Sequence, residues 1–143
     1  MKNPFLSFFF RGGKVIPIAG AKEDSVLMDK AFDKISQTLA EGEIICIFPE
    51  GKITYDGEIS SFRPGIEKII TRNPVPVIPM GLKGLWGSFF SRKYGPAGTN
   101  YKILIQRFWS KVDLIIEQPE APHLATAQLL EEKVRRLVSE KDN

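Results

Sequence analysis

Residues 44–51 read Ile44-Ile45-Cys46-Ile47-Phe48-Pro49-Glu50-Gly51, an apolar run that ends in proline, glutamate and glycine. A short apolar run bounded by such residues predicts a buried β-strand. The strand would end at Phe48 and continue into a loop that carries a carboxylate and an open backbone. In an open α/β sheet, ligands bind at the carboxyl ends of the strands. The sequence therefore predicts a ligand-binding loop directly after Phe48.

The segments around this run alternate between strand-like and helix-like patterns. Strands are predicted over residues 15–18, 75–80 and 112–116, and helices over 26–40, 64–72 and 126–138. The apolar positions of the first helix fall on one face: Val26, Leu27, Ala31, Phe32, Ile35 and Leu39. Gly42 is suited to ending that helix, Pro64 to the first turn of the next one, and Asn73-Pro74 to closing it.

Alternating strands and helices predict an α/β fold with right-handed crossovers. We expect one domain over residues 1–143, with a mixed or mostly parallel sheet flanked by helices. Residues 1–14 would form an apolar and basic N-terminal segment, and residues 118–143 a C-terminal helix region.

The composition is that of a globular domain. Of 143 residues, 43% are hydrophobic and 26% are charged, which excludes disorder over most of the length. The single cysteine, Cys46, allows no disulfide within the chain and is predicted to be a buried thiol. No segment reaches the roughly 18 apolar residues of a membrane span, and residues 1–10 lack the features of a signal peptide. We expect no metal and no cofactor.

The net charge is +3, but the charged residues are unevenly distributed along the chain. Residues 68–111 contain no Asp or Glu. Basic and aromatic side chains are interleaved there, and cations beside aromatics suit an anionic membrane interface. The predicted membrane contacts are Trp86, Phe89, Phe90, Arg92 and Lys93. Two alternatives stay open: a core with a basic rim, and a nucleic-acid surface. No nucleic-acid-binding motif appears, so we expect no nucleic-acid partner.

Three segments in order carry a family resemblance. Phe48-Pro49-Glu50-Gly51, then Phe62-Arg63-Pro64-Gly65, then the apolar residues 75–80 resemble the glycerophospholipid acyltransferase family of the 1-acylglycerol-3-phosphate type. More narrowly, residues 49–54 are similar to the 2-acylglycerophosphoethanolamine acyltransferase branch. The resemblance covers about residues 3–117 and implies a bacterial-type enzyme of phospholipid biosynthesis.

The resemblance implies transfer of an acyl group from acyl-CoA or acyl-carrier protein to a hydroxyl of a lysophospholipid or acylglycerol phosphate. The enzyme would be peripheral on the cytoplasmic face of the membrane, and a homo-oligomer is an alternative state. The implied substrate-binding residues are Pro49, Glu50, Gly51, Lys52, Arg63 and Gly65. Arg63, at a helix N-terminus, would clamp the acceptor phosphate and face the space in front of Glu50.

The family's general base is a histidine in a His-x-x-x-x-Asp motif, upstream of the first strand. The sequence starts after that point, and its one histidine, His123, follows a proline and has no aspartate five residues on. We therefore expect no catalytic residue in this chain and little acyl transfer by it alone, since a general base contributes roughly 10²–10⁴-fold. The alternative is a non-catalytic domain that binds lipid or acyl-carrier protein at a membrane surface.

Overall fold

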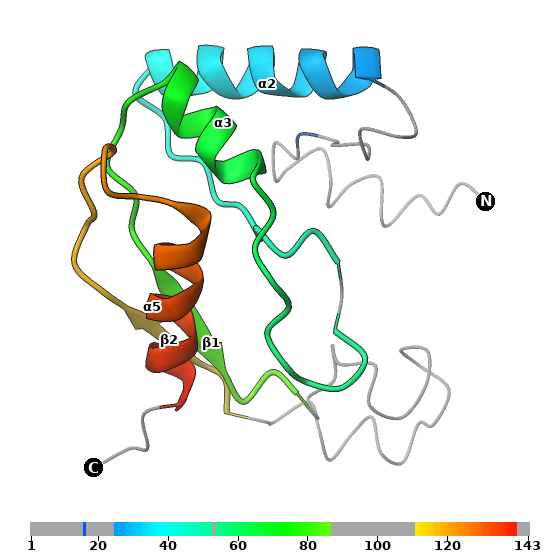
Figure 1. Cartoon of the computed structure of the whole chain (residues 1–143), viewed down its shortest axis with the longest axis vertical. Coiled ribbons are helices and arrows are strands. Elements are labelled where there is room, and N and C mark those ends of the chain that lie inside the picture. The colour runs from blue at the N-terminus through cyan, green and yellow to red at the C-terminus, as the bar shows by residue number, and fades with distance from the viewer. Residues whose placement is uncertain (1–15, 17–24, 53, 87–110, 140–143) are drawn as a thin grey trace. The chain divides into compact units, whose positions relative to one another are not determined.

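The fold is described from a computed structural model of the chain. Its helices and strands are labelled in Figure 1. Two compact units make up the chain, Met1–Cys46 and Ile47–Asn143. The residues that the structure describes are 16, 25–52, 54–86 and 111–139.

Helix α2, Ser25–Ala40, belongs to the first unit. It buries Ala31, Phe32 and Ile35, as the spacing predicts. Val26 and Leu27 are exposed instead of inward-facing, which corrects that part of the prediction. Gly42 ends the helix as predicted: it adopts φ 78°, a left-handed conformation that favours glycine, and its N–H donates to the Leu39 carbonyl at 3.1 Å.

The core of the second unit lies between helix α3, Gly65–Arg72, and the start of helix α5, Ala127–Ser139. Four buried side chains form it, and four partly buried ones pack around them. The buried residues are Ile66, Ile70, Ala125 and Leu130, and the partly buried ones are Ile47, Phe62, Val77 and Ala127. Pro64 directly precedes α3, where its missing N–H costs nothing, and Asn73 caps the other end. Both limits match the prediction to within a residue.

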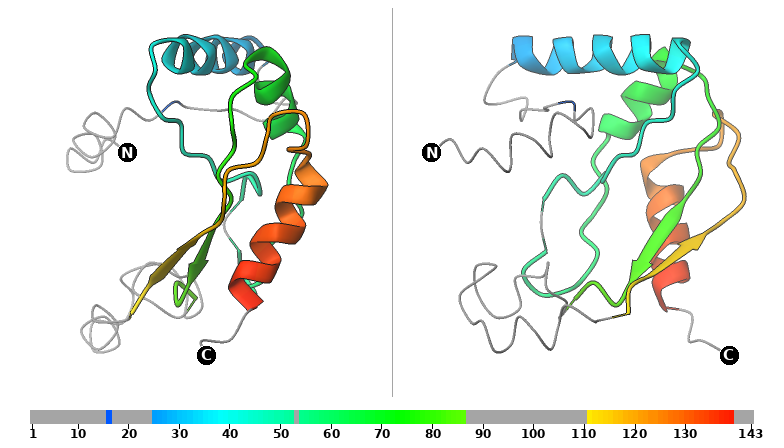
Figure 2. Two further views of the ribbon diagram at one scale, coloured as in Figure 1. Left: turned by 90° about the vertical axis from the view of Figure 1, so that its left-hand side faces the viewer. Right: turned by 180° about the vertical axis from the view of Figure 1, so that it is seen from behind.

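Strands β1, Met80–Lys83, and β2, Asp113–Ile116, form an antiparallel pair in which Met80 lies opposite Ile116. Helix α5 runs along one face of this pair, as the two views of Figure 2 show. Gly81 permits the close approach, because a Cβ there would lie 3.0 Å from a methyl group of Val138. The exposed apolar residues of the two strands are Met80, Leu82, Leu114 and Ile116.

Beyond the two strands the pairing continues through an isolated bridge between Val77 and Glu120. Two residues separate Val77 from Met80, but three separate Ile116 from Glu120. The extra residue that follows β2 is a β-bulge. Side chains of a regular strand alternate between faces, so the extra residue lets Glu117 and Glu120 both contact Lys133 of α5. The hydrogen bond to Glu120 is the main cause that raises the pKa of Lys133.

The strand predicted over residues 44–48 is not found. In the described part of the chain no strand pairs with this segment. Ile44 is 93% exposed and Cys46 is also exposed, so the predicted buried thiol is wrong. Burial alternates along the segment, because Ile45 and Ile47 face inward while their neighbours do not. An apolar run indicates burial on both faces only where a partner covers each face.

The remaining strand predictions have mixed outcomes. The strand expected over 75–80 begins only at Met80, since Pro76 and Pro79 lack the N–H that a ladder needs. The segment predicted over 15–18 lies, except for Ile16, outside the described residues. The mixed or mostly parallel sheet within one domain stays a prediction. No helix in the described ranges is long and apolar enough to cross a bilayer.

Candidate functional site: the Glu50–Gly51 turn and its pocket

The turn after Phe48 is tied to the start of α3. The N–H of Gly51 donates to the carbonyl of Phe48 at 3.1 Å, and the N–H of Arg63 donates to the carbonyl of Pro49 at 2.9 Å. Gly51 adopts φ 63°. A Cβ at this position would lie 2.9 Å from Nε of Arg63, so the arginine side chain packs directly on the bare α-carbon. The turn therefore favours glycine for its backbone conformation, and the missing side chain leaves the space that Arg63 occupies.

The loop that follows folds back onto Glu50. The N–H of Ser60 donates to Oε2 of Glu50 at 2.6 Å, which holds the carboxylate over the loop. At the tip of the loop, the chain bends at Asp56-Gly57. The hydroxyl of Thr54 donates to Asp56 at 2.7 Å, and this bond is the main cause that lowers the pKa of the Asp56 carboxyl.

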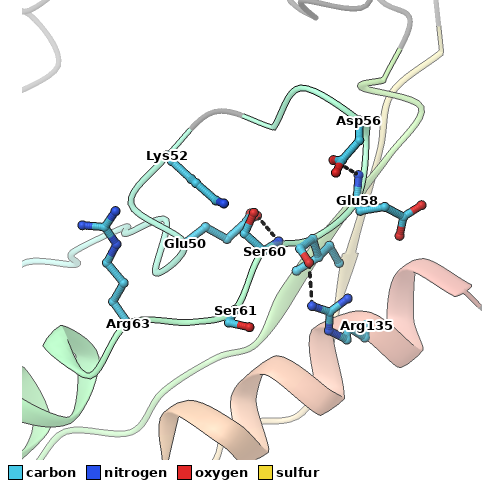
Figure 3. A pocket seen from close by; sticks show the side chains of 9 residues that line it. Glu50, Lys52, Asp56, Glu58, Ser60, Ser61, Arg63 and Arg135 are labelled. Atoms are coloured by element: carbon cyan, nitrogen blue, oxygen red, sulfur yellow. Dashed lines mark hydrogen bonds between the residues drawn. The ribbon is translucent and has the colours of Figure 1, made fainter.

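Turn and loop enclose a pocket of about 440 Å³. Figure 3 shows the side chains that line it. They are Glu50, Lys52, Asp56, Glu58, Ile59, Ser60, Ser61, Arg63 and Arg135. Three are cationic and three are carboxylates, so the pocket is suited to a polar, charged ligand. Proteins bind phosphate with the ammonium group of lysine, which acts as a point charge, and with the planar guanidinium of arginine, which can donate two parallel hydrogen bonds.

Helix α5 holds the far side of the loop. Nη2 of Arg135 donates to the carbonyl of Ile59 at 2.5 Å, and the N–H of Phe62 donates to Oε2 of Glu131 at 2.9 Å. Glu131 and Arg135 also pair with each other at 2.9 Å. The hydrogen bond from Phe62, followed by that from Arg135, lowers the pKa of the Glu131 carboxyl. Sequence reasoning missed both residues, because an i, i+4 glutamate–arginine pair is typical of any exposed helix face.

The structure brings Glu50, Lys52 and Arg63 to one pocket, with Pro49 and Gly51 in the turn beside it. Gly65 starts α3 and does not line the pocket. In Figure 3 the Arg63 guanidinium is turned away from the Glu50 carboxylate, rather than toward the space in front of it as expected. That these residues bind substrate stays a prediction.

His123 lies exposed in the turn before α5, as expected for a residue outside the site. Over the described residues, no group of His, Cys, Asp and Glu side chains is suited to hold a metal ion.

Among the predicted membrane contacts, only Trp86 belongs to the described residues. It lies over the tip of the loop, since a Cβ on Gly57 would be 2.7 Å from its indole ring. Trp86 is half-buried, so part of the ring remains accessible. Phe89, Phe90, Arg92 and Lys93 lie outside the described residues.

The turn, Arg63 and the start of β1 all fall within residues 1–83, which match the model of the family described as Acyltransferase. The chain therefore belongs to the acyltransferase family of enzymes. It is 29% identical over 66 residues to a Mycoplasma pneumoniae protein named "Probable 1-acyl-sn-glycerol-3-phosphate acyltransferase", covering 46% of this chain and 25% of that protein.

A second relative is the N-acylphosphatidylethanolamine synthase of Arabidopsis thaliana, which is 32% identical over 88 residues. The match covers 57% of this chain and 30% of the relative. The chain thus spans less than a third of the length of either protein. No solved structure matches it significantly. Helix α5 lies beyond the residues that match the family model.

Proposed function

We propose that this chain binds the acceptor in a phospholipid acyl-transfer reaction. The acyl group would pass from the thioester of acyl-CoA or acyl-carrier protein to a free hydroxyl of a lysophospholipid or acylglycerol phosphate. Family membership supports the reaction class. The name of the first relative specifies an acylglycerol phosphate, and the name of the second contains phosphatidylethanolamine, so both support a glycerophospholipid substrate.

The observation that carries the proposal is the placement of Arg63 on Gly51 at the rim of the pocket. Among the described residues Arg63 makes no ion pair, so its guanidinium has donors left for an anion. Lys52 adds a second positive charge to the same pocket. If the Arg63 guanidinium rotates toward Lys52 from its position in Figure 3, a phosphate bound by both cations would place the glycerol hydroxyls beside the Glu50–Gly51 turn.

Acyl transfer also needs a base that takes the proton of the attacking hydroxyl. The Glu50 carboxylate is engaged with the Ser60 N–H, and His123 stands outside the pocket with glutamine at the fifth position after it. The proposed role of the pocket is therefore acceptor binding, and neither Glu50 nor His123 is proposed as the base. A non-catalytic domain that binds lipid or acyl-carrier protein is the alternative, and the same pocket would serve it.

We further propose a bacterial-type protein that is peripheral on the cytoplasmic face of an anionic membrane. The acid-free stretch of residues 68–111 supports this, as does the accessible part of Trp86. The exposed apolar residues of β1 and β2 would also suit a second copy of the chain, so a homo-oligomer is a further proposed state.

Binding of a soluble acceptor tests the proposed pocket. Short-chain 1-hexanoyl-lysophosphatidate is expected to bind the wild-type chain, and Arg63→Ala is expected to weaken binding about tenfold or more, because hydrogen bonds to charged groups contribute about 1.5–3 kcal/mol. Isothermal titration calorimetry measures both affinities. Arg72→Ala, at the other end of α3, is the matched control. Equal weakening in both variants, or no binding by the wild type, would contradict the proposal.

Co-sedimentation with anionic vesicles tests the membrane surface. The double variant Arg92→Ala/Lys93→Ala should bind about 30-fold more weakly, since each cation near an anionic surface contributes about 1 kcal/mol. Added salt should also weaken vesicle binding by the wild type, because exposed charges are screened within about 10 Å at 0.1 M. Lys30→Ala/Lys34→Ala removes the same charge from the exposed surface of α2 and serves as the control. Equal recovery of both double variants would argue against the proposed surface.

A further inference from the structure

One peptide unit connects helix α5 to the glutamate of the candidate site. The carbonyl of Ile59 accepts a hydrogen bond from Arg135, and the N–H of Ser60, in the same peptide unit, donates to Glu50 at 2.6 Å. A cation on the oxygen of a peptide polarises it and strengthens the bond that its N–H donates. Figure 3 shows both bonds as dashed lines on opposite sides of the loop. The arginine and the glutamate are thus coupled without touching each other.

A second contact fixes the same segment three residues farther along. Glu131 accepts the N–H of Phe62, while the next N–H, that of Arg63, holds the carbonyl of Pro49. Because Glu131 also pairs with Arg135, both anchors belong to one charged pair on α5. The segment between them has no helix or strand of its own. Its geometry therefore depends on these side chains.

We propose that Arg135 is a positioning residue for the acceptor site, which orients Glu50 and its turn through the peptide between Ile59 and Ser60. The inference rests on the proposed acceptor-binding function and assigns part of that function to α5, outside the residues that match the family model. The neighbouring Arg136 provides an internal comparison. It lies on the same helix turn but pairs with Glu117 at 2.7 Å, away from the loop. Arg135 is 42% exposed and Arg136 56%, so the two differ mainly in what they contact.

The first test uses amide resonances of the full 143-residue chain. Arg135→Gln keeps the Cβ and Cγ methylenes but removes the charged donor to the Ile59 carbonyl. Because the Ser60 N–H then bonds Glu50 more weakly, the Ser60 amide should move upfield and exchange with solvent about tenfold faster. Arg135→Lys keeps a charged donor and should restore much of the shift. Arg136→Gln should leave the Ser60 amide unchanged. A general loss of stability would instead accelerate exchange at many amides.

The second test is titration of the same variants with 1-hexanoyl-lysophosphatidate. Arg135→Gln is expected to weaken binding about fivefold to tenfold, Arg135→Lys less, and Arg136→Gln not at all. An unchanged Ser60 amide in Arg135→Gln, or an equal change in Arg136→Gln, would overturn the coupling to Glu50. A shifted amide with unchanged affinity would overturn the role in acceptor binding. If the wild type does not bind this probe, the acceptor role of the pocket fails, whereas the Ser60 resonance still decides whether Arg135 orients Glu50.

Discussion

Replacing Gly51 by valine is expected to remove acceptor binding and to lower the free energy of unfolding by about 1–3 kcal/mol. Two effects act together at this position. Valine at φ 63° is strained, and its Cβ would lie within 2.9–3.1 Å of three atoms of the Arg63 side chain. The Arg63 side chain must then shift, which displaces its guanidinium from the position that lines the pocket. Urea unfolding measures the stability, and calorimetry with 1-hexanoyl-lysophosphatidate measures the binding.

Gly42→Val is the matched control for this substitution. Gly42 has a similar φ, 78°, but a Cβ there meets nothing within 4 Å. The control should show the backbone strain alone and retain ligand affinity. If both variants lose affinity equally, the packing of Arg63 on Gly51 is not what forms the site. If Gly51→Val binds as the wild type does, the turn has no role in acceptor binding.

Leu130→Ala is expected to lower the free energy of unfolding by about 2–5 kcal/mol, a large part of the about 5–15 kcal/mol of a typical domain. Leu130 is 4% exposed and lies in the core with Ile66 and Ile70 of α3, so truncation leaves a cavity between the two helices. Phe62, two residues from Ser60 in the loop, packs against the same core. The cavity should therefore loosen the candidate site before the chain unfolds.

Leu124→Ala serves as the control for the core substitution. Leu124 is 51% exposed in the turn before α5, and its truncation should change stability by less than about 0.5 kcal/mol. Urea unfolding of both variants makes the comparison. A small effect of Leu130→Ala, similar to that of Leu124→Ala, would mean that α3 and α5 do not share a packed core.

The candidate site is assembled from distant parts of the chain. The turn and loop come from residues 48–63, within the match to the acyltransferase family. Their anchors, Glu131 and Arg135, stand 69 and 76 positions farther along than the backbone groups they bind. A variant that removes α5 would thus alter the pocket while leaving every residue of the family motif in place.

The sequence correctly predicted the features that depend on interactions between residues close together in the chain. Helix limits follow from periodicity, from proline at the start of α3 and from glycine after α2, which all act within a few residues. The turn at Glu50–Gly51 follows from the same short-range rules, and its motif pointed to the family that the comparison shows. The apolar run before it was misleading, because burial on both faces depends on partners that periodicity does not reveal.

By itself, then, the sequence determined the helices, the turn and the family, since each depends on residue types at close spacing. Only the tertiary structure decided which charged residues act on the turn. Arg135 and Arg136 are identical in type and adjacent in the chain, yet one reaches the Ile59 carbonyl and the other reaches Glu117. Adjacent residues of a helix point about 100° apart around its axis, so the rotation of α5 about that axis selects between them. Contacts between residues far apart in the chain set this rotation.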